Sequence, residues 1–186
     1  MSKYIDFIDN IFGFIEQGKI KIRIMFTQNI YEPTLLSDYH ADNEYFLLYY
    51  QLIKNAFGLR YCNNTQDEVN IQLLLDDMPD KPEKVKKFKN YLCDISDLSS
   101  FKDANIKIIP EGISEVKSHN HSILQGLDII LGAMQFRLND RHKEKPDGQS
   151  RRGKRTRAKE CVYKHINKKI REVRPGFNIG ITTASP

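Results

Sequence analysis

The sequence contains no tryptophan, only 3 cysteines and no long apolar run among its 186 residues. Three widely spaced cysteines exclude a framework of paired disulfides and a zinc ribbon built on Cys-x-x-Cys pairs. No segment approaches the ~20 apolar residues of a membrane span, and no charged-then-apolar signal sequence opens the chain. We therefore expect a cytoplasmic protein with reduced thiols and no membrane partner.

The composition is that of a folded protein, with 40% hydrophobic and 28% charged residues. This balance argues against wholesale disorder, and the length suits one domain. We expect residues 1–186 to form a single domain, with a basic loop at 140–155 and a basic helix at 156–173.

Charge is distributed unevenly along the chain. Residues 141–174 hold fourteen Lys and Arg against four Asp and Glu, whereas the whole chain carries a formal net charge of +5, so the remainder is net acidic. A basic run attracts polyanions, and each phosphate that it neutralises releases counterions. A solvated loop that only keeps the chain soluble is the alternative. The residues predicted to bind nucleic acid are Arg151, Arg152, Lys154, Arg155 and Arg157.

Apolar periodicity alternates along the chain between helical and strand spacings. Helices are expected at 3–16, 42–58, 83–95, 122–138 and 156–173, and strands at 20–26, 69–76, 105–109 and 177–182. This alternation favours an α/β domain of layered architecture, with a small, partly parallel sheet flanked by helices. Three or four strands are few against the usual number of about five or six. We therefore expect an incomplete sheet in a chain that is a fragment or has lost its first strands.

Two aspartates, Asp76 and Asp77, end the strand expected at 69–76. Ligands of open α/β sheets gather beyond the carboxyl ends of the strands, and successive strand residues point to opposite faces, so only one of the two faces a given site. The alternative is turn chemistry, because Asp-Asp-Met-Pro-Asp is a good turn sequence.

The helix expected at 122–138 is apolar over most of its circumference, except for a stripe that includes Gln125 and Asp128. An ionised carboxylate is costly to bury without a partner, so the stripe faces either water or a polar site that holds a cation. Gly126 and Gly132 cost about 1 kcal/mol each in a helix, which predicts that something packs closely there.

A carboxylate from the loop expected after residue 109, Glu111 or Glu115, would complete an acidic metal site with Asp76 and Asp128. Oxygen ligands of this kind select Mg²⁺ or Mn²⁺, and such ions polarise phosphodiesters and position the attacking water. The sequence shows no His-Glu-x-x-His motif, no phosphate-binding glycine loop and no Gly-x-Ser-x-Gly elbow.

The run from Glu115 to Ala133 resembles the signature of the domain-of-unknown-function 3800 family, uncharacterised proteins of bacteria and mobile elements. That signature is a Ser, then Leu-Gln-x-x-Asp, then an apolar stretch and Gly-Ala. Phe177–Thr183 is similar to a late segment of the same family, and the likeness spans nearly the whole chain. The matching signature positions are Ser118, Leu124, Gln125, Asp128, Gly132 and Ala133.

The resemblance implies a ribonuclease-H-like fold with an acidic, metal-dependent site. It implies metal-ligand roles for Asp128, for Asp76 or Asp77, and for Glu115, with Ser118 and Gln125 as positioning residues. The family's opening Asp-Glu-Ser-Gly strand and its Trp-containing tail have no match here. We therefore expect weak metal binding and impaired catalysis by this chain alone.

Three functions follow from these patterns. The first is a Mg²⁺- or Mn²⁺-dependent nuclease-like domain of mobile-element or phage-associated type, with Asp76 and Asp128 as its catalytic residues. The second is a non-catalytic nucleic-acid binder. The third is a protein-interaction module that uses an aromatic face, although aromatic residues at helical spacing are usually core residues; these are Tyr45, Phe46, Tyr49 and Tyr50.

Overall fold

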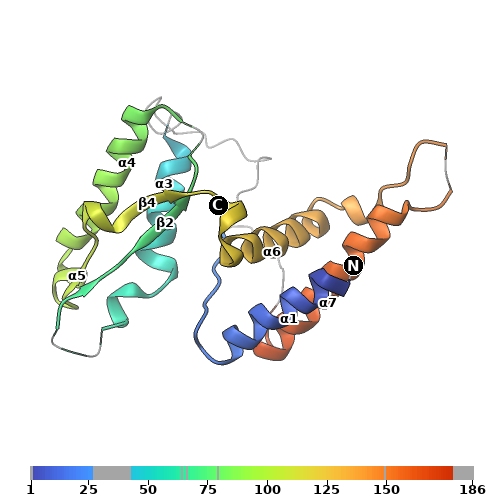
Figure 1. Cartoon of the computed structure of the whole chain (residues 1–186), viewed down its shortest axis with the longest axis horizontal. Coiled ribbons are helices and arrows are strands. Elements are labelled where there is room, and N and C mark those ends of the chain that lie inside the picture. Colours follow the sequence, from blue (N-terminus) through green and yellow to red (C-terminus); the bar gives the residue numbers. More distant parts are fainter. Residues whose placement is uncertain are drawn as a thin grey trace, which may run out of the picture. The chain divides into compact units, whose positions relative to one another are not determined.

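The computed structural model describes residues 2–26, 43–63, 65, 67–78, 80–148 and 150–177. The chain divides into two compact units (Figure 1). Residues 23–121 form the strand unit, and residues 1–22 and 122–186 form the helix unit. Each unit is described by itself, and the single domain over residues 1–186 stays a prediction.

The strand unit combines helices with short parallel strands. Its helices are α3 (Glu44–Gln51), which continues into a π-helical turn at Leu52–Ala56, α4 (Pro82–Asp94) and α5 (Ser99–Lys102). Its strands are β1 (Val69–Asn70), β2 (Leu73–Asp76), β3 (Ile106–Lys107) and β4 (Ile113–Val116). Strand β1 pairs with β3, and β2 pairs with β4, both in parallel.

The strand expected at 69–76 is present but divided into β1 and β2. Their pairing partners, β3 and β4, are likewise two separate strands. Pro110, which has no N–H group for a ladder, opens a 3-10 turn at Pro110–Gly112 between β3 and β4. A Cβ added at Gly112 would lie 3.0 Å from the backbone carbonyl oxygen of Ile71, and this tight contact favours glycine here. Strand β4 falls in the segment that the sequence analysis treated as a loop, and that expectation was wrong.

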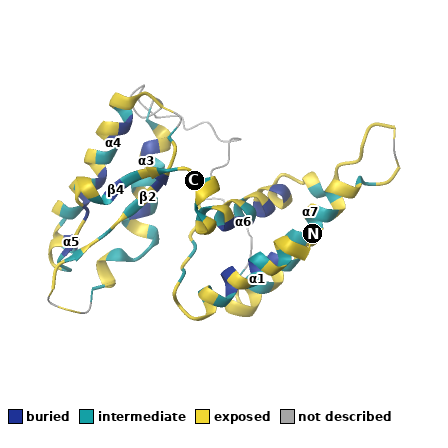
Figure 2. Cartoon of the chain, viewed as in Figure 1, coloured by how far each residue is buried: buried dark blue, intermediate teal, exposed yellow. Residues whose placement is uncertain are grey.

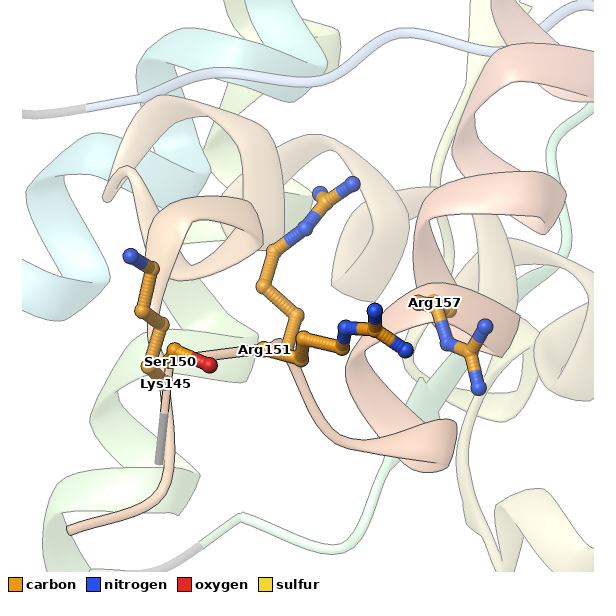
Figure 3. Close-up of a pocket in the computed structure, with 5 residues that line it drawn as sticks. Lys145, Ser150, Arg151 and Arg157 are labelled. Atoms are coloured by element: carbon orange, nitrogen blue, oxygen red, sulfur yellow. The ribbon is translucent and has the colours of Figure 1, made fainter. Parts of the chain in front are cut away.

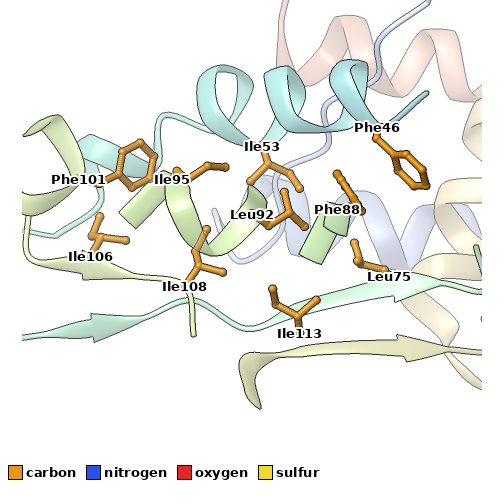
Figure 4. Close-up of a cluster of buried hydrophobic side chains, with 10 residues drawn as sticks. All are labelled: Phe46, Ile53, Leu75, Phe88, Leu92, Ile95, Phe101, Ile106, Ile108 and Ile113. Carbon is orange, nitrogen blue, oxygen red and sulfur yellow. The ribbon is translucent and has the colours of Figure 1, made fainter. Parts of the chain in front are cut away.

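The core of the strand unit lies between its helices and its strands (Figure 4). Phe88 of α4 is 2% exposed and stacks on Phe46 of α3 with ring centroids 4.7 Å apart. Tyr49 and Tyr50 pack against the same core, whereas Tyr45 is 48% exposed. Most of the aromatic stripe is therefore core, and this favours the core interpretation over the interaction face.

The helix unit packs α1 (Ser2–Glu16), α6 (Ser122–Leu138) and α7 (Lys154–Val173) against one another. Ile8, Ile130 and Ile166 are almost fully buried, one from each helix, and the outer faces are exposed (Figure 2). The expected close packing is confirmed at Gly126, where an added Cβ would lie 2.9 Å from Ile11 Cδ1. At Gly132 the same expectation is wrong, because nothing lies within 4 Å of an added Cβ.

Two further expectations meet different outcomes. The expected strand at 20–26 is wrong: its residues alternate between half-buried and exposed, but no strand pairs with them among the described residues, and a strand needs a partner for its backbone. The expected strand at 177–182 lies, apart from Phe177, outside the described residues.

The helices and parallel strand pairs agree with the expected α/β class. The expected helices at 3–16, 83–95 and 122–138 are confirmed, and the basic helix begins at Lys154, two residues earlier than expected. Within the described residues, no helix combines the length and the apolarity that a membrane crossing requires.

Candidate functional site

Asp76 lies at the carboxyl end of β2, where the backbone of β4 also ends. Its Oδ1 atom accepts the backbone N–H of Ser118 at 3.2 Å and that of Asp77 at 3.1 Å. Because β2 and β4 are parallel, both strands deliver their carboxyl ends to one edge. The structure thus brings together Asp76 and Ser118, two of the expected site residues, and leaves the carboxylates of Asp76 and Asp77 exposed.

Glu115 lies on β4 rather than in a loop, and its carboxylate already has a partner. Lys89 of α4 donates to Glu115 Oε1 at 2.7 Å. This hydrogen bond is the main reason why the pKa of Glu115 is lowered, and the Met78 backbone N–H adds to the effect. A metal ion at Glu115 would therefore compete with Lys89 for this carboxylate.

Tyr45 of α3 interacts electrostatically with Asp76, although the sequence analysis gave it no place in the site. Burial raises its pKa to about 12, and the neighbouring Tyr49 and the charge of Asp76 act in the same direction. No sequence motif marks this tyrosine, because its place depends on the packing of α3.

The expected metal ligands are divided between the two units. Asp76, Asp77 and Glu115 belong to the strand unit, whereas Asp128 and Gln125 belong to helix α6 of the helix unit. Among the residues that the structure describes, no group of three His, Cys, Asp or Glu side chains is placed to hold a metal ion. A Mg²⁺ or Mn²⁺ site shared by Asp76 and Asp128 stays a prediction.

Asp128 is exposed and lines a groove of about 470 Å³ between α1, α6 and α7. Two cationic residues of α7, Arg155 and Lys159, line the same groove. The stripe on α6 therefore presents its carboxylate at the protein surface, close to positive side chains of the chain itself.

The basic segment forms a second hollow, of about 380 Å³, between the loop and the start of α7 (Figure 3). We call it the basic pocket; its lining residues are Lys145, Ser150, Arg151, Arg152 and Arg157. Three of the five expected nucleic-acid-binding residues are thus gathered in one place. Arg155 lines the groove instead, and Lys154 lies exposed in the first turn of α7.

Arg152 differs from its neighbours in the basic pocket because it holds the loop in place. Its guanidinium donates to the carbonyl oxygen of His142 at 2.9 Å and pairs with Glu160 of α7. Among the described residues, Lys145, Arg151 and Arg157 make no such ion pair, so their charges face an open hollow. The sequence, in which these residues form one basic segment, does not distinguish the arginine that supports the loop from the residues that line the pocket without an ion pair.

No family model, no curated protein and no solved structure matches the chain. The resemblance to the domain-of-unknown-function 3800 family accordingly stays a prediction that depends on the residues quoted for it.

Proposed function

We propose that the chain binds nucleic acid, with the phosphates of the strand held in the basic pocket. The observation that carries this proposal is the gathering of Lys145, Arg151 and Arg157 around one open hollow. Within the described part of the chain these three side chains have no carboxylate partner. Like charges held together repel each other, and a phosphate anion relieves that repulsion while releasing its own counterions.

A salt titration of DNA binding tests this proposal. The triple variant Lys145→Gln, Arg151→Gln, Arg157→Gln removes the cations that face the pocket but keeps Arg152, which supports the loop. The slope of log K against log salt should shrink by up to roughly 0.9 per lost phosphate contact on duplex DNA. Fluorescence anisotropy with labelled DNA at several salt concentrations gives this slope.

The matched control removes the same amount of charge from helix α4 and the residue before it. Lys81→Gln, Lys86→Gln, Lys87→Gln changes three exposed lysines of the strand unit. The control should keep the wild-type slope. Equal slopes for both triple variants would reject the basic pocket as the phosphate site.

A metal-dependent nuclease with a ribonuclease-H-like fold is the second candidate. The place of Asp76 at the carboxyl ends of β2 and β4, with its carboxylate fixed by Ser118, supports it. In this candidate Asp76 and Asp128 hold Mg²⁺ or Mn²⁺, and the ion polarises the phosphodiester. Asp77 and Glu115 are further carboxylates for the ion, and Gln125 is a positioning residue.

A cleavage assay with Mg²⁺ or Mn²⁺ tests the second candidate. Asp76→Asn and Asp128→Asn should each abolish cleavage, because each removes a metal ligand and leaves the helices and strands intact. The exposed Asp103→Asn is the control and should keep full activity. Unchanged cleavage in Asp128→Asn would reject the nuclease and leave the binding function standing.

A further inference from the structure

The groove in the helix unit has a composition that phosphate binding alone does not explain. Its apolar lining includes the buried residues Ala133 and Phe136 and the half-buried residues Ile129 and Val162. Its polar lining is exposed: Tyr4, which is 56% exposed, Asp128, Arg155 and Lys159. The groove thus combines an apolar interior with one carboxylate and two cations at its surface.

These features together restrict the class of ligand. The volume of about 470 Å³ lies within the range of roughly 300–1,000 Å³ typical of small-molecule sites. A purely apolar ligand would leave three charged side chains unused, and a bare anion would leave the apolar interior unused. A nucleobase with its phosphate uses all of them, because it has an apolar face, hydrogen-bonding edges and a negative charge.

The groove and the basic pocket flank the same turns of helix α7. Arg155 and Lys159 line the groove, and Arg157 lines the basic pocket. At about 100° per residue, Arg155 and Arg157 point to nearly opposite sides of the helix. A flexible single strand can bend around the helix and reach both hollows, whereas a duplex is stiff over about 150 base pairs.

We infer that the groove holds an unpaired base of a single-stranded nucleic acid whose phosphates occupy the basic pocket. This inference rests on the proposed nucleic-acid binding and names the form of the strand. Asp128 accepts a hydrogen bond from the amino group of the base, and Arg155 and Lys159 contact the flanking phosphates. Bases with an exocyclic amino group are therefore preferred to thymine or uracil, which have none.

Filling the groove tests the inference. No atom lies within 4 Å of a Cβ added at Gly132, so Gly132→Met places a side chain in the groove without a clash at its base. Gln135→Met adds the same side chain to an exposed position of α6 outside the groove and is the matched control. Thermal unfolding confirms that both variants are folded.

The probes are fluorescein-labelled deoxycytidine and thymidine oligomers of about twelve nucleotides, within the range of known single-strand sites, and a duplex of similar length, all in EDTA. Gly132→Met should weaken single-strand binding about tenfold, which is within the range that the loss of one bound base causes. Duplex binding and the salt slope should stay unchanged. Asp128→Asn should remove the preference for cytosine over thymine, and Asp128→Glu should keep part of it.

The outcomes separate this inference from the function on which it rests. Equal single-strand affinities for Gly132→Met and Gln135→Met, or equal losses for single strand and duplex, would overturn the groove as a base site. If the basic pocket is not the phosphate site, the triple variant in the pocket shows the same salt slope as its control variant. If the wild type binds no oligomer, cytidine 5′-monophosphate is titrated while the methyl NMR signals of Ile129 and Val162 are followed. Shifts lost in Gly132→Met support the groove, and the absence of shifts overturns it.

Discussion

The carboxylate of Asp9 links helix α1 to helix α7. His165 Nε2 lies 2.7 Å from Asp9 Oδ1, and Lys169 Nζ lies 3.6 Å from the same oxygen. The hydrogen bond with His165 is the largest cause of a lowered pKa for Asp9, and the positive charges of His165 and Lys169 act in the same direction. A carboxyl group whose pKa is lower in the folded than in the unfolded state stabilises the fold above its ordinary pKa.

This pairing predicts a specific pH dependence. The ordinary pKa of Asp9 is 3.8, so its contribution is present above pH 3.8 and disappears as the pH falls through the lowered pKa of the folded state. In His165→Leu, the pKa of Asp9 should rise toward 3.8, as measured from the carboxyl carbon by NMR. The loss of stability in His165→Leu should also shrink as the pH falls below 3.8. A loss that stays constant from neutral pH to pH 2 would assign the effect of His165 to packing alone.

At the scale of elements, helix α6 offers two glycines in opposite surroundings. Gly126 is buried, and an added Cβ would lie 2.9 Å from Ile11 Cδ1 of α1, whereas Gly132 is exposed with nothing within 4 Å. Alanine gains about 1 kcal/mol over glycine in a helix. In Gly126→Ala, however, that gain is opposed by the need to move the buried side chain of Ile11.

Gly132→Ala should therefore raise the free energy of unfolding by about 1 kcal/mol, and Gly126→Ala should gain less or lower it. Urea denaturation of both variants with a common m-value measures the difference. The pair serves as its own control, because both changes add one methyl group to the same helix. Equal gains at the two positions would contradict the close contact between α1 and α6.

The helices follow from the sequence more closely than the strands do, for a physical reason. The apolar spacing of 122–138 is an intrinsic property of that segment, and α6 has those bounds. A strand instead depends on a distant partner: the segment at 20–26 has the alternation but no paired strand among the described residues, while Ile113–Val116 pairs with β2 through contacts that no local pattern shows.

The same distinction applies to the candidate site. The position of Asp76 at a strand end follows from alternation and from its place before a turn, and the structure adds the N–H of Ser118 from 42 residues away. The pairing of Lys89 with Glu115 depends on how α4 packs against β4. The basic residues are visible in the sequence, but only their contacts separate Arg152, which pairs with Glu160, from Arg151 and Arg157.

At the scale of the whole molecule, the two proposed functions make different demands on the two units. Binding through the basic pocket and the groove uses residues of the helix unit alone. Metal-dependent cleavage requires Asp76 of the strand unit and Asp128 of the helix unit to ligate the same ion. Asp76 or Asp128 by itself would bind the ion weakly, because Mg²⁺ and Mn²⁺ prefer several oxygen ligands in a fixed arrangement.

The nuclease candidate therefore predicts a joint response of both units to one paramagnetic ion. Added Mn²⁺ should broaden the amide NMR signals of Asp77 and Ser118 over the same concentration range as those of Asp128 and Ile129, and excess Mg²⁺ should restore them all. Asp128→Asn should protect the amide signals of both units from broadening, because the shared ion is lost. Asp103→Asn should protect the signals of neither unit. If Asp128→Asn protects only the helix-unit signals, the carboxylates bind ions independently and the shared metal centre is rejected, whereas the proposed nucleic-acid binding is unaffected.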